Sequence, residues 1–364
     1  MPDRVVVAMS GGVDSSVALL KVLEAGYDAI GVTMKLWEYR DSGGNLLGES
    51  TCCPVEAINN ARDICVSYGV PHYTLDFQEV FQETVVDNFV EEYFRGRTPN
   101  PCVRCNSYVK WDALLRQAAQ LGAQIIATGH YARIANGPDG KPRLQRGMDQ
   151  HKDQSYMLWG INRDTLSQTF FPLGDMTKAQ VRQIARDNEL ITAEASESQE
   201  ICFIADDNYA RFLQSQGNGR LPDLENGEIV DESGKVIGTH RGYPFYTIGQ
   251  RRGLGIAHTE PLYVKELNPA ANQIKVAPQA SLYSTLCFIE NLNWLVDEPS
   301  APVQVHAQIR YNSTGALGQL TPEGDYFRLE FQEPQLAITP GQSAVFYDHE
   351  VVMGGGIIGH GGNT

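Results

Sequence analysis

Glycine and serine residues near the amino terminus form a string with the chemistry of a phosphate-binding loop. Ser10 to Ser16 reads SGGVDSS, follows the apolar run Val5–Met9 and precedes a helical pattern that starts near Asp14. Glycines let the backbone approach an anion closely, and the first N–H groups of a helix point toward it. The serine hydroxyls add further donors. Because no lysine follows as in G-x-x-x-x-G-K-[ST], we expect a phosphate loop that is not a Walker A loop.

Two cysteine-bearing strings offer a second kind of chemistry. TPNPCVRCN (98–106) carries Cys102 and Cys105, and SESQEICFI (196–204) carries Cys202. Seven cysteines, an odd number in a long chain without a secretory leader, favour catalytic or metal-binding thiols over a disulfide framework. The other four are more simply explained as small buried hydrophobic side chains: Cys52, Cys53, Cys65 and Cys287.

The first part of the chain alternates strand and helix patterns, which predicts a parallel sheet with helices on both faces. Pro99 and Pro101 predict an extended loop that leads into a helix near Asn106. The predicted strands are Val5–Met9, Ala29–Met34, His72–Leu75 and Ile125–Thr128. The predicted helices are Asp14–Leu23, Val55–Val66, Val80–Phe94, Trp111–Leu121 and Thr177–Leu190, the last capped by its threonine.

Beyond about Asp206, turn-forming pairs recur and the apolar runs become short. Short strands with frequent turns predict a small barrel at the carboxyl end, where the tail Gly354–Gly362 packs tightly. We therefore expect three domains, at residues 1–205, 206–280 and 281–364, with a mainly-β central domain. The β-like runs are Gly227–Val230, Gly242–Ile248, Val303–Ile309, Tyr326–Phe331, Ser343–Tyr347 and Val351–Ile358.

Basic residues are concentrated in two stretches of a chain that is acidic overall. The formal net charge is −15, yet residues 95–152 hold ten lysines and arginines against three acids. A second run, His240–Arg252, holds Arg241, Arg251 and Arg252 among aromatic residues. Nucleic acid can bind such faces, although excesses of this size also arise by chance. No stretch reaches the roughly 18–20 apolar residues of a membrane span and the amino terminus lacks a signal-peptide pattern, so we expect a cytoplasmic protein without a membrane partner.

The string SGGVDS resembles the phosphate loop of the ATP pyrophosphatase superfamily. The resemblance implies an adenine nucleotide α-hydrolase-like fold that binds ATP with Mg²⁺, cleaves it between the α and β phosphates and leaves an adenylate on the substrate. It also implies adenine contacts at the ends of two strands. The implied nucleotide contacts are Ala8, Met9, Ser10, Gly11, Gly12, Val13, Asp14, Ser15, Ser16, Met34 and Gly129.

Six strings spread along nearly the whole chain resemble the signatures of the tRNA-specific 2-thiouridylases. They are TPNPCVRCN, GHYA (129–132), KDQSYML (152–158), SESQEICFI, YTIGQRRGLGI (246–256) and GGGII (354–358). The resemblance implies ATP-dependent 2-thiolation of the wobble uridine in tRNAs for Lys, Glu and Gln, with release of AMP and pyrophosphate. It also implies that the central domain binds tRNA. The implied tRNA contacts are Asn100, Pro101, Cys102, His130, Lys152, Asp153, Gln154, Arg310, Tyr311 and Gln342.

Replacing a uracil oxygen by sulfur requires a leaving group and a sulfur nucleophile in one pocket. Adenylation supplies the first. By resemblance, Cys202 carries the sulfur as a persulfide, and Cys105 is the nucleophilic partner that can form a disulfide with it and release the sulfur to the base, or take the sulfur for attack. We expect the sulfur to come from a cysteine desulfurase or a relay of carrier proteins. Both thiols must ionise, so each pKa should lie below the ordinary ~8.5, a shift that Arg104 and a helix start at Asn106 would favour at Cys105.

Cys102 departs from the family pattern, because many members have Asp at that position. It forms a CxxC pair with Cys105, which leaves open an iron–sulfur cluster on Cys102, Cys105 and Cys202; a zinc site would lack a suitably spaced fourth ligand. Two other functions also stay open. One is an ATP pyrophosphatase that acts on a small molecule, such as an amide ligase, and the other is a tRNA-binding module whose ATP loop is regulatory or vestigial. We expect His130 to face the substrate instead of the core.

Overall fold

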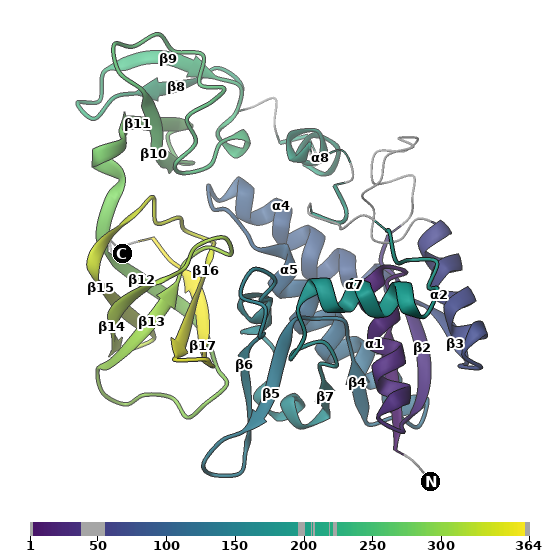
Figure 1. Cartoon of the computed structure of the whole chain (residues 1–364). Helices are drawn as coiled ribbons and strands as arrows, with labels where there is room; N and C mark the ends of the chain where they lie inside the picture. Colours follow the sequence, from purple (N-terminus) through teal and green to yellow (C-terminus); the bar gives the residue numbers. More distant parts are fainter. Residues whose placement is uncertain are drawn as a thin grey trace.

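The computed structural model describes residues 3–37, 55–195, 201–204, 206, 208–217, 219–220 and 224–360. The expectations for Cys52, Cys53 and residues 196–200 concern positions outside these ranges. Figure 1 shows an α/β domain that holds the amino terminus, a small β domain at the top, and a β-barrel in which the chain ends. No helix in the described ranges is long and apolar enough to cross a membrane.

A parallel sheet forms the centre of the amino-terminal domain. Side chains alternate along its strands, so Val5 and Val7 pack into one helical layer and Val6 and Ala8 into the other. The predicted parallel sheet with helices on both faces is confirmed. Its strands, in spatial order, are β3 (His72–Asp76), β2 (Asp28–Lys35), β1 (Arg4–Ala8), β4 (Ile125–Ala127) and β7 (Thr169–Phe170).

Helices cover the two faces of this sheet in separate layers. One core joins β1 to α1 (Val13–Glu24) and α2 (Val55–Ser67). The predicted threonine cap is confirmed at α7 (Lys178–Asp187), where Thr177 and Gln180 form a capping box. The other core contains the helical path made of α3 (Gln78–Phe81), η1 (Gln82–Val86) and α4 (Asp87–Phe94), together with the path made of α5 (Pro101–Arg104), η2 (Cys105–Leu114) and α6 (Leu115–Gln120).

The helix after Pro101 begins earlier than the sequence predicted. Asn100 caps it by accepting a hydrogen bond from the Val103 backbone N–H, and Pro101 takes the first helical position. Proline fits there because its fixed φ is helical and its missing N–H would have no helical partner. Cys102 and Cys105 therefore lie inside a helix, and a start at Asn106 is wrong. The π-helical η2 begins at Cys105, and such widened turns are frequent at functional sites.

A hairpin that the sequence analysis did not predict ties the α/β domain to the barrel. It consists of β5 (Ala132–Asn136) and β6 (Pro142–Arg146). β6 pairs with barrel strand β17 (Val351–Ile358), so the hairpin continues the barrel sheet. Short 3-10 turns η3 (Ser155–Leu158) and η4 (Arg163–Gln168) follow it along the chain.

The central domain is mainly β, as predicted, but one predicted strand is absent. Residues 242–248, where we expected a strand, contain a short 3-10 turn instead, η6 (Tyr243–Phe245). Pro244 cannot donate to a ladder, and Gly242 has a φ of 121° that extended strands do not use. Helix α8 (Tyr209–Gln216) leads into the domain. Its strands are β10 (Leu262–Asn268), β11 (Gln273–Pro278), β8 (Gly227–Val230) and β9 (Val236–His240), in spatial order.

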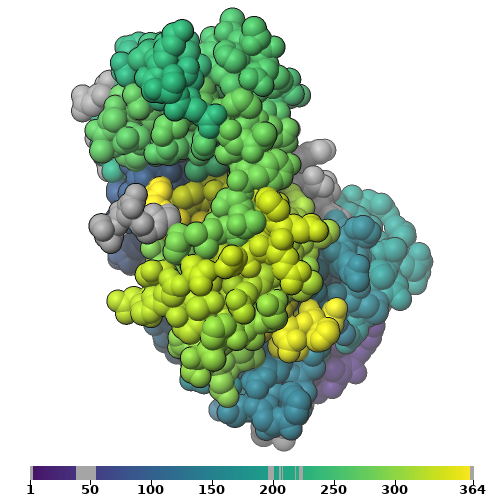
Figure 2. Space-filling view, turned by 90° about the vertical axis from the view of Figure 1, so that its left-hand side faces the viewer, coloured from purple at the N-terminus to yellow at the C-terminus, as the bar shows by residue number. Residues whose placement is uncertain are grey.

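The carboxyl-terminal part closes into the predicted barrel because β12 (Tyr283–Trp294) pairs with β17 as well as with β15 (Tyr326–Leu336). Cys287 and Cys65 are buried, as expected, in the barrel and the α/β core respectively. At Gly354 an added Cβ would lie 2.3 Å from the Asn293 carbonyl oxygen, so tight packing explains the glycines of β17. Figure 2 shows the barrel face with the central domain above it. Besides β17, the barrel contains β12 (Tyr283–Trp294), β13 (Val303–Gln308), β14 (Ala316–Glu323), β15 (Tyr326–Leu336) and β16 (Ser343–Asp348).

Candidate active site

A cavity of about 630 Å³ opens where the strand order of the parallel sheet reverses. β1 lies between β2 and β4, and the cavity is lined from the ends of all three strands. Ligands bind at such switch points in open α/β sheets, outside the carboxyl ends of the strands. Residues from the barrel also line it, including Tyr311.

Most residues singled out from the sequence gather in this cavity. Those that line it are Ala8, Met9, Ser10, Gly12, Val13, Asp14, Ser15, Met34, Cys105, Gly129, His130, Lys152, Gln154, Cys202 and Tyr311. Those that do not line it are Gly11, Ser16, Asn100, Pro101, Cys102, Asp153, Arg310 and Gln342. The phosphate loop and both thiols assigned to sulfur chemistry therefore face one space.

The SGGVDSS loop is held in shape by its own hydroxyls. Ser15 Oγ and Ser16 Oγ donate to the Gly12 carbonyl oxygen over 3.0 and 2.8 Å, and the Ser10 backbone N–H donates to Ser15 Oγ over 3.2 Å. Gly11 has a φ of 76°, and an added Cβ would lie 2.1 Å from the Ala57 carbonyl oxygen. Only glycine fits there, so the loop takes its path because α2 packs against it.

A lysine distant in the sequence brings positive charge to this loop. Lys178 Nζ lies 2.8 Å from both carboxylate oxygens of Asp14, and the Tyr131 hydroxyl donates to the same carboxylate over 2.8 Å. Both Asp14 and Lys178 line the cavity. The sequence analysis missed Lys178, although the capping box places it at the start of α7. Tyr131 belongs to the string GHYA, but its residue type alone predicted no role for it.

The two cysteines of the CxxC pair have different surroundings. Cys105 is buried and lines the cavity, whereas Cys102 is exposed and does not. Cys102 is the second residue of the helix, while Cys105 lies a turn further along, where the field of a helix start has largely decayed. Arg104 Nε donates to the Thr84 carbonyl oxygen over 2.6 Å, and its guanidinium lies over the Tyr108 ring. The proposed helix start at Asn106 therefore does not act on Cys105.

His130 lies at the cavity wall beside a threonine hydroxyl and an aromatic ring. Its Nδ1 is 2.7 Å from Thr128 Oγ1, and its ring packs near Trp111. Burial, with the charge of Lys110 second, lowers the pKa of His130 well below its usual value. The imidazole is therefore neutral near neutral pH. Lys110, which the sequence analysis did not single out, also lines the cavity and donates to Asn106 Oδ1 over 2.8 Å.

Several residues assigned to tRNA by resemblance bind other parts of the protein. Gln342 Nε2 donates to the carbonyl oxygens of Thr98 and Pro99, which holds the loop before Asn100 against the barrel. Arg310 donates to the Ala337 carbonyl oxygen. The Asp153 carboxylate accepts hydrogen bonds from backbone and side-chain groups of its own loop and from Arg146.

The described ranges contain no group of three or more His, Cys, Asp or Glu side chains that could hold a metal ion. Cys102, Cys105 and Cys202 all lie within these ranges. Their arrangement does not fit the iron–sulfur cluster that the sequence left open, because such a cluster needs the three sulfurs around one centre.

An open parallel α/β sheet with a phosphate loop at its switch point defines the class of nucleotide-binding α/β proteins. The chain matches three family models: the tRNA methyl transferase HUP domain over residues 3–206, the tRNA methyl transferase PRC-barrel domain over 216–278, and the aminomethyltransferase beta-barrel domain over 284–358. The tRNA-specific 2-thiouridylase MnmA of Carboxydothermus hydrogenoformans is 46% identical over 360 residues, covering 98% of this chain and 97% of that protein.

A second relative gives the same result. MnmA of Salinibacter ruber is 46% identical over 362 residues, covering 98% of this chain and 94% of that protein. The chain therefore belongs to the family of tRNA-specific 2-thiouridylases, and it is an enzyme of the sulfurtransferase class. Among solved structures, the U34-tRNA thiolase NcsA from Methanococcus maripaludis with its [4Fe-4S] cluster matches with a TM-score of 0.34 and 17% identity, covering 59% of this chain and 66% of that chain. A likeness this weak carries no argument.

Proposed function

We propose that this chain uses MgATP to adenylate the C2 oxygen of the wobble uridine in tRNA and then replaces that oxygen with sulfur from a Cys202 persulfide. The observation that carries the proposal is that one cavity is lined by the phosphate loop, by Cys105 and by Cys202. A substrate oxygen activated there lies within the same space as both thiols. Family membership supports tRNA as the substrate that presents the oxygen.

ATP fits the cavity with its phosphates at the loop and its adenine near Met34 and Gly129. An added Cβ on Gly129 would lie 2.8 Å from the Asp14 backbone carbon, so the end of β4 and the start of α1 are in close contact. Lys110 and Lys178 also line the cavity and suit a polyphosphate. Mg²⁺ would be held mainly by phosphate oxygens and water, because the carboxylate of the loop, Asp14, is paired with Lys178.

The sulfur step balances without a redox cofactor. The terminal sulfur of the Cys202 persulfide attacks C2 of the adenylated uracil, the C–S bond forms, and the C–O bond to AMP breaks. The Cys105 thiolate then attacks the Cys202 sulfur, which breaks the S–S bond to the substrate and leaves 2-thiouridine. Cys105 and Cys202 end as a disulfide, so an external thiol reductant must restore them before a cysteine desulfurase or carrier protein reloads Cys202.

The wobble uridine must leave its stack to reach the cavity, because the reacting C2 oxygen has to approach both the nucleotide and the thiols. We propose that Asn100, Pro101 and Cys102 hold the flipped base from outside the cavity lining, to which they do not belong. We propose that His130, Lys152, Gln154 and Tyr311 contact the anticodon arm, and that tRNAs for Lys, Glu and Gln are the acceptors. The exposed Arg251 and Arg252 form no ion pair with any described residue, so their charges stay available for phosphates.

We further propose that three units divide this work: residues 1–205 catalyse, 206–280 bind tRNA as an adaptor, and 281–364 form the barrel. The family models for the three parts support this division because they match residues 3–206, 216–278 and 284–358.

Pyrophosphate release and thiolation, measured separately, test the proposal. With purified chain, ATP and unmodified tRNA, pyrophosphate should form only when tRNA is present. Cys202→Ser should still release pyrophosphate but lose thiolation in a persulfide-fed assay, because adenylation precedes sulfur transfer. Cys287→Ser, in the barrel core, is the matched control and should thiolate at close to the wild-type rate. Full thiolation by both Cys105→Ser and Cys202→Ser would contradict the mechanism, and pyrophosphate release without tRNA would favour a small-molecule substrate.

A further inference from the structure

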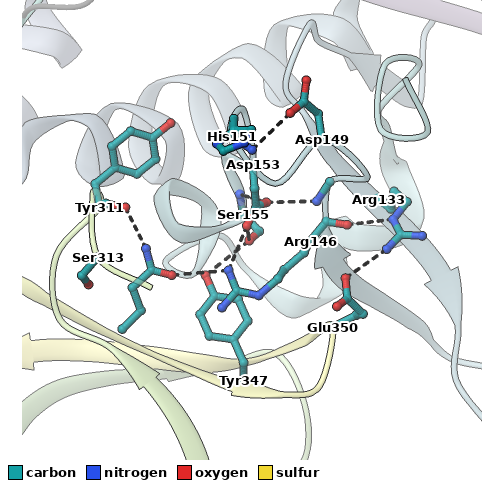
Figure 3. A network of polar contacts seen from close by, with 12 residues as sticks. Arg133, Arg146, Asp149, His151, Asp153, Ser155, Tyr311, Ser313, Tyr347 and Glu350 are labelled. Atoms are coloured by element: carbon teal, nitrogen blue, oxygen red, sulfur yellow. Dashed lines mark hydrogen bonds and ion pairs between the residues drawn. The ribbon is translucent and has the colours of Figure 1, made fainter. Parts of the chain in front are cut away.

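Arg146, the last residue of β6, lies where the α/β domain joins the barrel. Its backbone N–H donates to the Glu350 carbonyl oxygen over 2.9 Å, and its own carbonyl oxygen accepts from Arg133 Nε over 2.7 Å. Arg133 in turn reaches the Glu350 carboxylate, so backbone and side chains fix this corner to the barrel (Figure 3). The Arg146 side chain therefore starts from a fixed point between two domains.

One loop that depends on Arg146 belongs to the α/β domain. Residues 147–155, here called the Lys152 loop, close around the Asp153 carboxylate, which accepts from the Gly147 and Ser155 backbone N–H groups, each over 3.0 Å. Arg146 NH1 donates to the same carboxylate over 3.0 Å. The Asp153 side chain is only 8% exposed, and a buried charge needs a counter-charge. The loop's path therefore depends on the guanidinium.

The other loop belongs to the barrel. Residues 309–313, here called the Tyr311 loop, are held by Gln308, whose Nε2 donates to the Arg310 and Tyr311 carbonyl oxygens over 3.1 and 2.8 Å. Gln308 Oε1 accepts from Arg146 NH1, the nitrogen that also binds Asp153, over 3.4 Å. The guanidinium carbon lies 3.5 Å from the centre of the Tyr347 ring, which fixes the guanidinium plane.

We infer that Arg146 is a positioning residue that sets the separation of the Lys152 loop and the Tyr311 loop. Both loops line the cavity, the first through Lys152 and Gln154 and the second through Tyr311. Arg146 itself does not line it. One guanidinium thus presents side chains from two domains together to one substrate. The identity of that substrate as tRNA rests on the proposed function, whereas the link between the loops rests on the contacts themselves.

Hydrogen exchange on the full chain tests the link without using activity. Arg146→Met should speed amide exchange in both loops by about tenfold, which corresponds to a loss of about 1.4 kcal/mol of local stability. Gln308→Glu keeps an acceptor for Arg146 but cannot donate to the carbonyls of the Tyr311 loop, so it should speed exchange in that loop alone. The control is Arg163→Met, which breaks a 2.7 Å ion pair with Asp297 between the same two domains. It should change neither loop.

Kinetics of the same variants separate positioning from general damage. Arg146→Met should raise the KM for tRNA about tenfold while the KM for ATP stays within about twofold, because Arg146 positions the Lys152 loop and the Tyr311 loop and not the phosphate loop. Arg146→Lys should restore exchange protection mainly in the Lys152 loop, since a lysine can pair with Asp153 but cannot also match Gln308 and stack on Tyr347. If Arg146→Met does not fold, Arg146→Lys and Gln308→Glu test the inference instead. Each should lose exchange protection mainly in the Tyr311 loop.

Equal amide exchange rates in the two loops of Arg146→Met and Arg163→Met would overturn the inference. So would equal rises in the KM for tRNA and the KM for ATP in Arg146→Met. If wild-type chain thiolates tRNA and Arg146→Met behaves like the control, the inference fails and the proposed function stands. If the wild-type chain leaves tRNA unmodified but the two loops exchange as expected, the proposed function fails and the positioning role of Arg146 stands.

Discussion

Gly11→Ala tests whether the packing of α2 sets the shape of the phosphate loop. The substituted residue would keep a φ of 76°, which costs roughly 1–2 kcal/mol for a residue with a Cβ. Its Cβ would also lie 2.1 Å from the Ala57 carbonyl oxygen. Carbon needs about 3.5 Å from a neighbouring heavy atom, so the loop or the start of α2 must move by more than about 1 Å. A shift of that size at a reacting centre can cost about 100-fold in rate.

Gly26→Ala is the matched control, because Gly26 has a φ of 83° and no neighbouring atom within 4 Å of an added Cβ. It isolates the backbone strain from the clash. The assay is tRNA-dependent pyrophosphate release as a function of ATP concentration. Gly11→Ala should lower kcat/KM for ATP by about 100-fold, and Gly26→Ala by no more than about threefold. Equal kcat/KM values for the two variants would refute the view that α2 shapes the loop.

Three further predictions concern other parts of the site. Lys178→Met should raise the KM for ATP about tenfold in the same assay, and Asp14→Asn should recover part of that loss, because it removes the carboxylate that Lys178 pairs with. Burial lowers the pKa of His130, so below about pH 6.5 the unfolded chain binds a proton that the folded chain does not, and the free energy of unfolding falls. Between pH 7.5 and pH 5.5, urea unfolding of His130→Gln should show a smaller loss of that free energy than wild type. Gln342→Glu should raise the KM for tRNA about tenfold, because it loses both donors to the loop before Asn100, while exposed Gln332→Glu should not.

The sequence predicted the α/β layers well because their signal is local. Apolar runs such as that of β1 report burial on both faces, and a threonine three residues before a glutamine reports the start of α7. The helix after Pro101 was misplaced because two prolines were taken to extend the chain, whereas the second is favoured at the first helical position once Asn100 caps it.

Contacts between distant segments left no comparable signal. Lys178 reaches Asp14 across 164 residues, and Arg146 joins Asp153 to Gln308 of the barrel. Neither pair is visible in a periodic pattern, because pairing depends on how α7 and the β5–β6 hairpin pack after folding. The hairpin itself was overlooked because its short strands, with only Leu144 and Ala132 fully buried, lack a strong alternation.

The most direct measurement is mass spectrometry of the wobble nucleoside after unmodified tRNA is incubated with the chain, ATP and a persulfide donor. We predict 2-thiouridine at that position, with one AMP formed for each sulfur inserted, in wild type and in Cys287→Ser but in neither Cys105→Ser nor Cys202→Ser. An unmodified wobble uridine in the wild-type reaction, or thiolation that continues without ATP, would contradict it.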